Sequence, residues 1–194
     1  MTTAEMLTHV RMLLDESSAS FWGDSDIYLA LTNGQKAVAS VLIQKKSPLA
    51  DKLRKQATAA YGTDWLNVPS DYWSVISVTY RNLIIGNYVA CRERTGDIFV
   101  KQGNPYLAGS IEDPFFYVAN GALVFEPTTT TSSAYKMLYY KLPTDISGST
   151  EPTLNAATHD AICQYAFAEL LLRDTKHQES ALEFKKFTDM VSIL

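Results

Sequence analysis

The chain has 194 residues, of which 46% are hydrophobic and 20% are charged. These values are typical of a folded globular protein with a sizeable core, and they exclude a wholly disordered chain. The formal net charge is -4, with 17 Lys and Arg against 21 Asp and Glu. This balance argues against a protein whose main task is to bind nucleic acid, because neutralising phosphates requires an excess of cations.

Membrane insertion and disulfide bonding are also disfavoured by the sequence. No apolar stretch approaches the roughly 20 residues that a membrane-spanning helix needs. The first 15 residues include Glu5 and Asp15 and have periodic apolar positions, so they do not resemble a signal peptide. Cys91 and Cys163 lie in unlike contexts without a CxxC motif. We therefore expect two reduced thiols and synthesis in the cytosol.

Three helices are predicted in the first third of the chain. The first runs from about 3 to 14, where apolar residues recur at spacings of three and four. The second begins at Asp24 or Ser25, either of which can cap it, and is interrupted by Gly34 at a cost of about 1 kcal/mol relative to Ala. An Ala- and Lys-rich stretch at 49–61 predicts the third helix.

From about Trp65 the chain changes character. β-branched and aromatic residues now dominate, with Pro, Gly and Asn between them, which favours strands. The dipeptide Asn120-Gly121 predicts a tight type I′ hairpin, and the hydroxyl-rich run 128–133 predicts a loop or hairpin tip. The strand candidates are 75–80, 83–90, 98–101, 115–119, 122–126 and 135–141.

Helical patterns return after a linker at 143–152. The segment 161–172 is apolar almost all round, which is typical of a helix buried between other elements. The segment 176–194 has a single apolar stripe and is expected to pack on a core. That stripe consists of Ala181, Phe184, Phe187, Val191 and Leu194.

Together these segments predict an α+β fold with one compact domain. Residues 1–66 and 151–194 supply the helices of a bundle, and residues 67–150 form an antiparallel β-subdomain inserted between them. No internal repeat of fixed period is present.

The sequence contains no recognisable catalytic constellation. The motifs GxSxG, GxGxxG, GxxxxGK[ST] and HExxH do not occur. His9, His159 and His177 lack the spacing of a metal site, and His159 is expected to be a surface residue near a helix start. Acidic pairs such as Asp24 and Asp26 are more typical of helix starts than of acid–base catalysis. We therefore expect no enzymatic activity, no cofactor and no metal.

Adjacent aromatic residues are the most informative feature of the sequence. Neighbouring side chains in a strand point to opposite faces, so a pair places one ring away from the core. Aromatic residues are enriched where proteins meet proteins, although a thin β-subdomain can also cover both faces itself. Base stacking is disfavoured because no Lys or Arg is interleaved. The candidate interface residues are Phe21, Trp22, Tyr72, Trp73, Tyr106, Phe115, Phe116 and Tyr139.

Several segments also occur in a characteristic order. They are FWGDSDI at 21–27, LTNGQKA at 31–37, VPSDYW at 68–73, YVANGALVFEP at 117–127, LYYKLP at 138–143 and HDAI at 159–162, followed by ELL at 169–171. In this order they resemble the head–tail adaptor (connector) proteins of tailed bacteriophages. The resemblance covers nearly the whole chain and rests on the order of the segments, since each alone is a helix cap, a hairpin or a strand end.

The resemblance implies a non-enzymatic structural protein at the head–tail interface of the virion. Twelve copies would form a ring beneath the portal, extend the DNA channel and offer an attachment surface to the tail. The implied partners are the portal ring, a downstream tail or stopper protein and other copies of the chain, with no membrane involved. DNA would pass without sequence-specific binding, and the mild acidity suits such a channel.

Two alternatives remain open from the sequence. The chain could be a tail-completion or stopper protein of the same neck assembly, which would bind a protein further from the portal. It could also be a small enzyme or regulator whose site is dispersed along the sequence.

Overall fold

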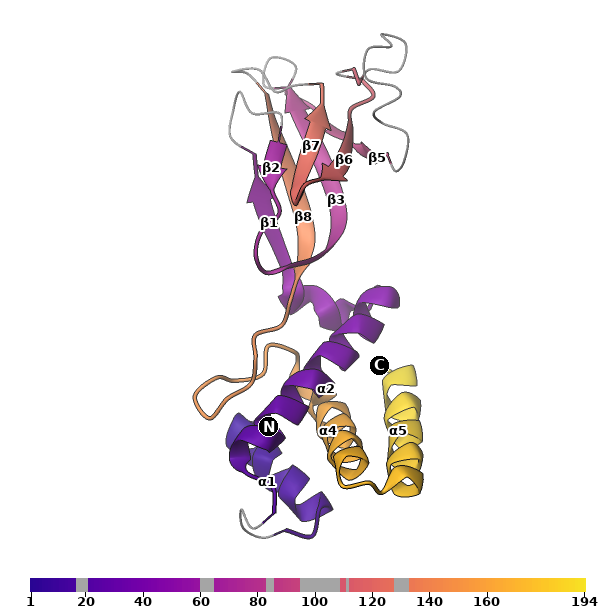
Figure 1. Ribbon diagram of the computed structural model, residues 1–194. Coiled ribbons are helices and arrows are strands. Elements are labelled where there is room, and N and C mark those ends of the chain that lie inside the picture. Colours follow the sequence, from indigo (N-terminus) through magenta and orange to yellow (C-terminus); the bar gives the residue numbers. More distant parts are fainter. Residues whose placement is uncertain (17–20, 60–64, 83–85, 95–108, 111, 128–132) are drawn as a thin grey trace. The chain divides into compact units, whose positions relative to one another are not determined.

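The computed structural model describes residues 1–194 except 17–20, 60–64, 83–85, 95–108, 111 and 128–132 (Figure 1). The chain forms two compact units. Unit 1 comprises Met1–Leu53 and Leu142–Leu194, and unit 2 comprises Arg54–Lys141. Unit 1 is built from helices of both chain ends and unit 2 from strands, which confirms the predicted α+β fold. The inserted unit spans 54–141, whereas the sequence indicated 67–150.

The first helix begins where the sequence predicted. The second begins at Asp24 with Gly23 as its N-cap, whereas the sequence indicated Asp24 or Ser25 as the cap. In α1 (Thr3–Leu13), Thr2 N donates to the Glu5 carboxylate at 2.7 Å, and Glu5 N donates to the Thr2 hydroxyl at 3.3 Å. This capping box closes the first turn. In α2 (Asp24–Gln44), the Asp26 carboxylate accepts a hydrogen bond from the backbone N–H that precedes the helix. None of the helices among the described residues is long and apolar enough to cross a bilayer.

A glycine allows α2 to pack closely on α4 (His159–Arg173). A Cβ at Gly34 would lie 2.7 Å from the carbonyl oxygen of Ile162, closer than side-chain atoms approach backbone. The helix is not interrupted at Gly34, contrary to the prediction. The absence of a side chain at this position allows the two helix backbones to come close together. Next to it, Asn33 donates to the Glu169 carboxylate at 3.0 Å.

The linker is also anchored to α2. The side chain of Gln35 is fully buried, donates to the Thr144 carbonyl at 2.8 Å and accepts from Thr153 N at 2.6 Å. A 3₁₀ turn, η2 (Ala156–Thr158), then leads into α4. Helix α4 packs against α1, α2 and α5 and is largely buried, as its apolar sequence predicted.

The last helix, α5 (His177–Ser192), covers α4 with only part of the predicted stripe. Val191 is buried, and Phe184 and Phe187 are half-buried with their rings edge-on to Tyr165 at 5.3 and 5.1 Å. Ala181 is exposed, contrary to the prediction, because the neighbouring Ser180 takes the buried position and donates to the carbonyl of Ala168 at 2.8 Å.

The predicted third helix is wrong. Residues Pro48–Leu53 form a short 3₁₀ helix, and Arg54–Thr58 form strand β1, which pairs antiparallel with β8 (Ser133–Lys141). The Ala- and Lys-rich composition favours a helix locally. Pairing with a strand about 80 residues later overrides that preference, because β8 supplies the backbone partners.

The described residues of unit 2 form two four-stranded sheets. Sheet A has the order β1-β8-β3-β4, and sheet B has the order β2-β7-β6-β5. All pairs among the described strands are antiparallel except β5–β6. The remaining strands are β2 (Trp65–Asn67), β3 (Tyr72–Asn82), β4 (Tyr88–Ala90), β5 (Arg92–Glu93), β6 (Phe115–Ala119) and β7 (Ala122–Glu126).

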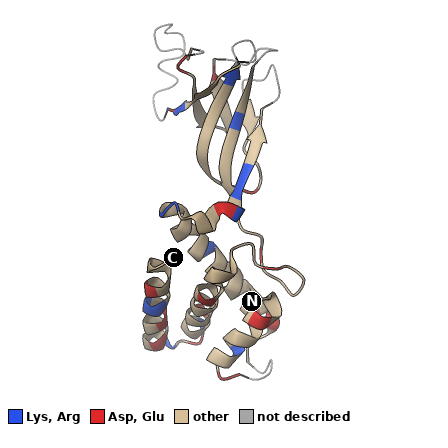
Figure 2. Cartoon of the chain, turned by 180° about the vertical axis from the view of Figure 1, so that it is seen from behind, with Lys and Arg blue, Asp and Glu red and all other residues tan. Residues whose placement is uncertain are grey.

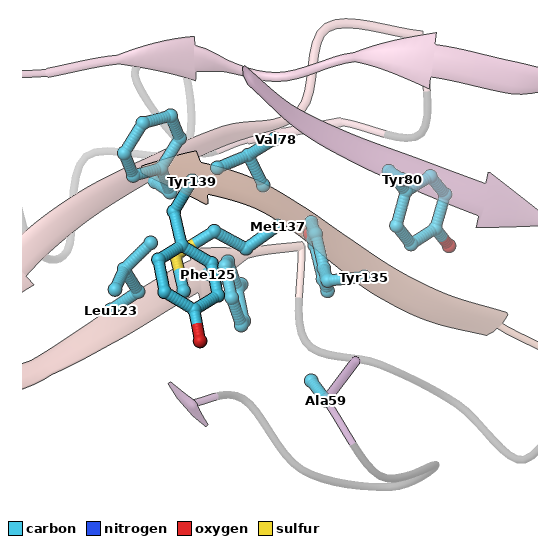
Figure 3. Close-up of a cluster of buried hydrophobic side chains, with 9 residues drawn as sticks. Ala59, Val78, Tyr80, Leu123, Phe125, Tyr135, Met137 and Tyr139 are labelled. Atoms are coloured by element: carbon cyan, nitrogen blue, oxygen red, sulfur yellow. The ribbon is translucent and has the colours of Figure 1, made fainter. Parts of the chain in front are cut away.

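The core of unit 2 lies between the two sheets (Figure 3). Phe125 from sheet B and Tyr135 from sheet A stack with ring centroids 4.0 Å apart. The cluster of buried side chains consists of Ala59, Val78, Tyr80, Phe116, Leu123, Phe125, Tyr135, Met137 and Tyr139.

The predicted hairpin between β6 and β7 is confirmed. Asn120 and Gly121 have φ angles of 50° and 74°, and Ala119 pairs with Ala122. Positive φ at both central residues defines the type I′ turn. The strand candidate 98–101 and most of the loop 128–133 lie outside the described residues.

Both cysteines are free thiols. Cys163 is buried in α4, and Cys91 is half-buried against the core of unit 2. Burial raises the pKa of each thiol to about 12, so both are protonated at neutral pH and are poor nucleophiles.

His159 is buried rather than exposed, which corrects the sequence-based expectation. Its Nε2 lies 3.3 Å from the Leu154 carbonyl oxygen, and Nδ1 is buried without a hydrogen-bond partner in the described part of the chain. Burial lowers the pKa of His159 below 6.5, with smaller opposing contributions from the backbone of Leu154 and Met1.

The first prediction concerns the contact between α2 and α4. Gly34→Ala inserts a methyl group against the Ile162 carbonyl, and we expect this overpacking to cost about 1–3 kcal/mol of unfolding free energy. This cost exceeds the gain of up to about 1 kcal/mol in helix propensity. Gly148→Ala is the control, because its Cβ would make only ordinary contacts with the Tyr28 side chain, the nearest being the hydroxyl at 3.4 Å. Urea denaturation measures both, and equal effects would contradict the close approach.

The second prediction concerns pH. Because the pKa of His159 is lower in the folded state, the unfolded chain binds the proton more tightly. The unfolding free energy should therefore fall as the pH drops through about 6.5 and level off below the folded pKa. His159→Gln, which retains an N–H near Leu154, should flatten this dependence. His177→Gln, at an exposed position, should leave it unchanged, and denaturation at several pH values compares the three proteins.

Candidate protein-docking surface

Two aromatic side chains stand on the surface of unit 1 just before α2. Phe21 is 68% exposed and Trp22 is half-buried. Their rings pack edge-on with centroids 5.0 Å apart. We call this pair and the groove beside it the Phe21–Trp22 surface.

A buried ion pair holds the backbone of these two residues. One oxygen of the Glu16 carboxylate accepts hydrogen bonds from Phe21 N at 2.7 Å and Trp22 N at 3.2 Å. The other accepts from the Arg11 guanidinium at 3.2 Å. Arg11 also donates to the Trp22 carbonyl at 3.1 Å and to Asp24 at 2.5 Å. Because the Arg11 and Glu16 side chains are only 10% and 11% exposed, the charges are weakly screened and the geometry is strongly fixed.

A groove of about 420 Å³ opens beside the aromatic pair. Its floor is apolar and comes from the end of α1 and from α4. Its rim is charged and comes from the turn after α1 and from the start of α5. The apolar lining residues are Leu13, Leu14, Phe21, Trp22, Phe167, Leu170 and Leu171, and the charged ones are Asp15, Glu16, Asp174, Lys176 and Glu179.

The rim carries more negative charge than the ion pairs among the described residues neutralise. Glu16 is paired with Arg11, and Lys176 is paired with Asp174 at 2.8 Å. The hydrogen bond with Asp174 raises the pKa of Lys176, so the ammonium is charged at neutral pH. Asp15 and Glu179 are exposed and belong to no ion pair among the described residues. An apolar floor with an acidic rim can receive an apolar or aromatic group flanked by cations.

The other predicted interface residues do not join this surface. Tyr72 and Trp73 are half-buried on β3, and Tyr72 packs against the core of unit 2. Phe116 and Tyr139 are 3% and 1% exposed and belong to that core. Tyr106 lies outside the described residues.

In the aromatic pair on β6, the alternation of side chains along a strand overestimates how exposed the outward-facing ring is. Phe116 faces the core, as one member of such a pair must. Phe115 points to the other face but is only 4% exposed. The Arg94 guanidinium lies 3.9 Å from the centroid of its ring and covers it.

Tyr139 takes part in a structural hydrogen-bond network. Its hydroxyl donates to the Asp71 carboxylate at 2.9 Å, and Lys55 donates to the same carboxylate at 2.7 Å. The Lys55 hydrogen bond holds the pKa of Asp71 below its usual value, and burial raises the pKa of Tyr139. These hydrogen bonds connect β1 and β8 with the residue that precedes β3.

A second exposed cluster was not found by sequence reasoning. On sheet A, the Arg81 guanidinium and the Lys136 ammonium lie 5.1 and 5.2 Å from the ring centroid of Tyr88. Lys136 donates to the Tyr88 hydroxyl at 3.2 Å, which lowers the pKa of that phenol. Tyr88 is 49% exposed. The three residues meet only through strand register, because Arg81 pairs with Tyr88 and Thr79 pairs with Lys136.

No group of three or more His, Cys, Asp or Glu that could hold a metal ion occurs within the described part of the chain. The most distinctive features of the surface are thus an aromatic groove with an acidic rim and a tyrosine flanked by two cations. Both are suited to noncovalent contact with another macromolecule.

The third prediction tests the ion pair beneath the aromatic residues. Arg11→Met removes the cation and leaves the Glu16 carboxylate buried without its charged partner. We expect a loss of about 3 kcal/mol in unfolding free energy. Lys36→Met is the matched control, because its pair with Asp145 is 41% and 76% exposed and should contribute less than about 1 kcal/mol. Similar small losses in denaturant melts would show that the pair does not hold this surface.

A comparison with curated proteins finds no match to the chain. A comparison with protein families finds that the model for the SU10 adaptor protein matches residues 1–194. The match confirms the resemblance that the order of the sequence segments indicated. The chain therefore belongs to the SU10 adaptor protein family, a family of phage head–tail adaptors.

Proposed function

We propose that the protein is the subunit of a ring that docks beneath the portal, extends the DNA channel and provides the surface to which the tail attaches. Membership of a phage adaptor family makes the chain a structural component of the virion. The main support for the role as a ring subunit is the Phe21–Trp22 pair, which is held by hydrogen bonds at the edge of an apolar groove and exposes most of the Phe21 ring.

An exposed aromatic pair of this kind indicates assembly. A 68% exposed Phe21 leaves most of a phenyl ring in water, and the ring would gain free energy by burial against a partner. The Arg11–Glu16 pair fixes the backbone of the two residues before any partner arrives. Less conformational entropy is therefore lost on binding, which favours a specific contact.

The distribution of charge supports passage of DNA without tight binding. Unit 2 holds eight Lys and Arg and seven Asp and Glu, and unit 1 holds the remaining nine and fourteen of the chain's 17 and 21. Figure 2 shows acidic residues recurring along the helices of unit 1. A surface with excess carboxylates repels the phosphate backbone, so DNA near it can slide.

The fourth prediction tests the proposed function directly. When the protein is mixed with the purified portal ring of its phage, electron microscopy should show a second ring, with twelve subunits, attached to the portal. Absence of that density would overturn the proposal. Density that appears only after a further neck protein is added would instead identify a stopper or tail-completion protein.

Two variants connect this experiment to the aromatic pair. Phe21→Ser removes the exposed ring and should reduce the fraction of portals that carry the second ring, while unfolding free energy changes by less than about 0.5 kcal/mol. Leu29→Ser is the control, because Leu29 is 50% exposed on α2 and lies outside the groove lining. Equal ring formation by both variants would show that the pair does not contribute to assembly.

A further inference from the structure

Sheet A carries an excess of positive charge. Its four strands contain no Asp or Glu, and they carry Arg54, Lys55, Arg81, Lys136 and Lys141. Lys55 is paired with Asp71, a residue outside these strands. Figure 2 shows Lys and Arg in blue at several points along the strands of unit 2.

Arg81 and Lys136, both half-buried, lie beside the exposed Tyr88 on this sheet. Alternation along the strands places them on the face opposite to Val78, Tyr80 and Met137, which belong to the core. Neither is in an ion pair with a carboxylate among the described residues, and Arg81 Nε is buried without a hydrogen-bond partner. Tyr88, half exposed between them, supplies a flat apolar surface. We call these three residues the Arg81–Tyr88–Lys136 face.

This face is the complement of the Phe21–Trp22 surface. The groove offers an apolar floor and two exposed carboxylates, Asp15 and Glu179, which form no ion pair in the described part of the chain. The face offers one aromatic ring and two cations, Arg81 and Lys136. Oppositely charged surfaces that also bury aromatic rings attract each other and set the register of a contact.

Like surfaces of two copies repel each other. A groove placed against a second groove would bring Asp15 and Glu179 next to the same carboxylates of the other copy. A sheet A face placed against its own copy would bring cations together. Like-charge contacts of this kind cost several kcal/mol, so the charges favour a contact between unlike faces.

Duplex DNA fits the face less well than protein does. Binding of DNA through charge alone relies on Lys and Arg contacts to several phosphates and weakens steeply with salt. The face offers two cations that form no ion pair among the described residues, on a chain whose net charge is -4. A partner with a few carboxylates around an apolar centre matches both the number of cations and the exposed tyrosine.

We propose that the Phe21–Trp22 surface of one copy of the protein binds the Arg81–Tyr88–Lys136 face of a second copy. The inference rests on the proposed ring, which requires a head-to-tail contact between two different surfaces of each subunit. Asp15 and Glu179 of one copy meet Arg81 and Lys136 of the next, and Tyr88 lies against the apolar floor of the groove.

The fifth prediction uses charge reversal on the portal ring. Glu179→Lys and Lys136→Glu should each reduce the fraction of portals carrying a complete second ring by about tenfold or more. The double variant exchanges the two charges and should restore most of the ring formation. Lys185→Glu, on the exposed side of α5 and outside the groove, should form rings as the wild type does. Urea denaturation establishes that each variant is folded, and Arg81→Glu repeats the test if Lys136→Glu is not.

The outcomes separate the two proposals. If the wild type forms rings and the single reversals form them equally well, the contact is wrong and the adaptor function stands. If the single reversals fail and the double variant fails too, although it is folded, the two charges do not meet and the contact is again wrong. If the wild type forms no ring, the adaptor function fails and the contact fails with it. Binding of a short DNA duplex that is lost in Lys136→Glu, with ring formation unchanged, would assign the face to DNA instead.

Discussion

The close packing of α2 on α4 is the contact on which unit 1 depends. These helices are separated by more than a hundred residues of sequence, and Gly34 brings them together because a side chain there would strike the Ile162 carbonyl. Asn33 and Gln35, on either side of the glycine, add hydrogen bonds to Glu169 and to the linker. A β-rich unit can therefore be inserted between the helices without separating them, since the cost of closing a loop grows only slowly with its length.

The candidate docking surface is built on that packing. Helix α4 supplies Phe167, Leu170 and Leu171 to the floor of the groove, so its position sets the depth of the groove. The Arg11–Glu16 pair then fixes the chain at Phe21 and Trp22. The groups that stabilise the fold are thus different from the groups that are available for binding a partner. The buried ion pair and the glycine contact stabilise the fold, whereas the exposed rings contribute little to the core and remain available to a partner.

Elements with a strong local pattern could be predicted from the sequence. The helix start at Asp24, the apolar stretch of α4 and the Asn120-Gly121 turn each depend on residues a few positions apart. The failures involve partners that are distant in sequence. Residues 54–58 form a strand because β8 pairs with them, and Phe115 is covered because Arg94 lies over its ring. The local sequence around His159 is typical of an exposed, polar helix start, but the folded chain buries the side chain.

For the same reason, the Phe21–Trp22 surface could be predicted from the sequence and the Arg81–Tyr88–Lys136 face could not. Phe21 and Trp22 are adjacent, so their pairing is visible in the sequence, although the Arg11 and Glu16 contacts that hold them are not. Arg81, Tyr88 and Lys136 span 55 positions and meet only once the register of β3, β4 and β8 is known. A surface made by strand pairing has no local signature, because each residue taken alone is an ordinary outward-facing position. A net charge of -4 for the whole chain conceals it further, since the acidic excess of the rest of the chain outweighs the cations of sheet A. Charge has to be mapped onto the folded units before a contact between unlike faces can be recognised.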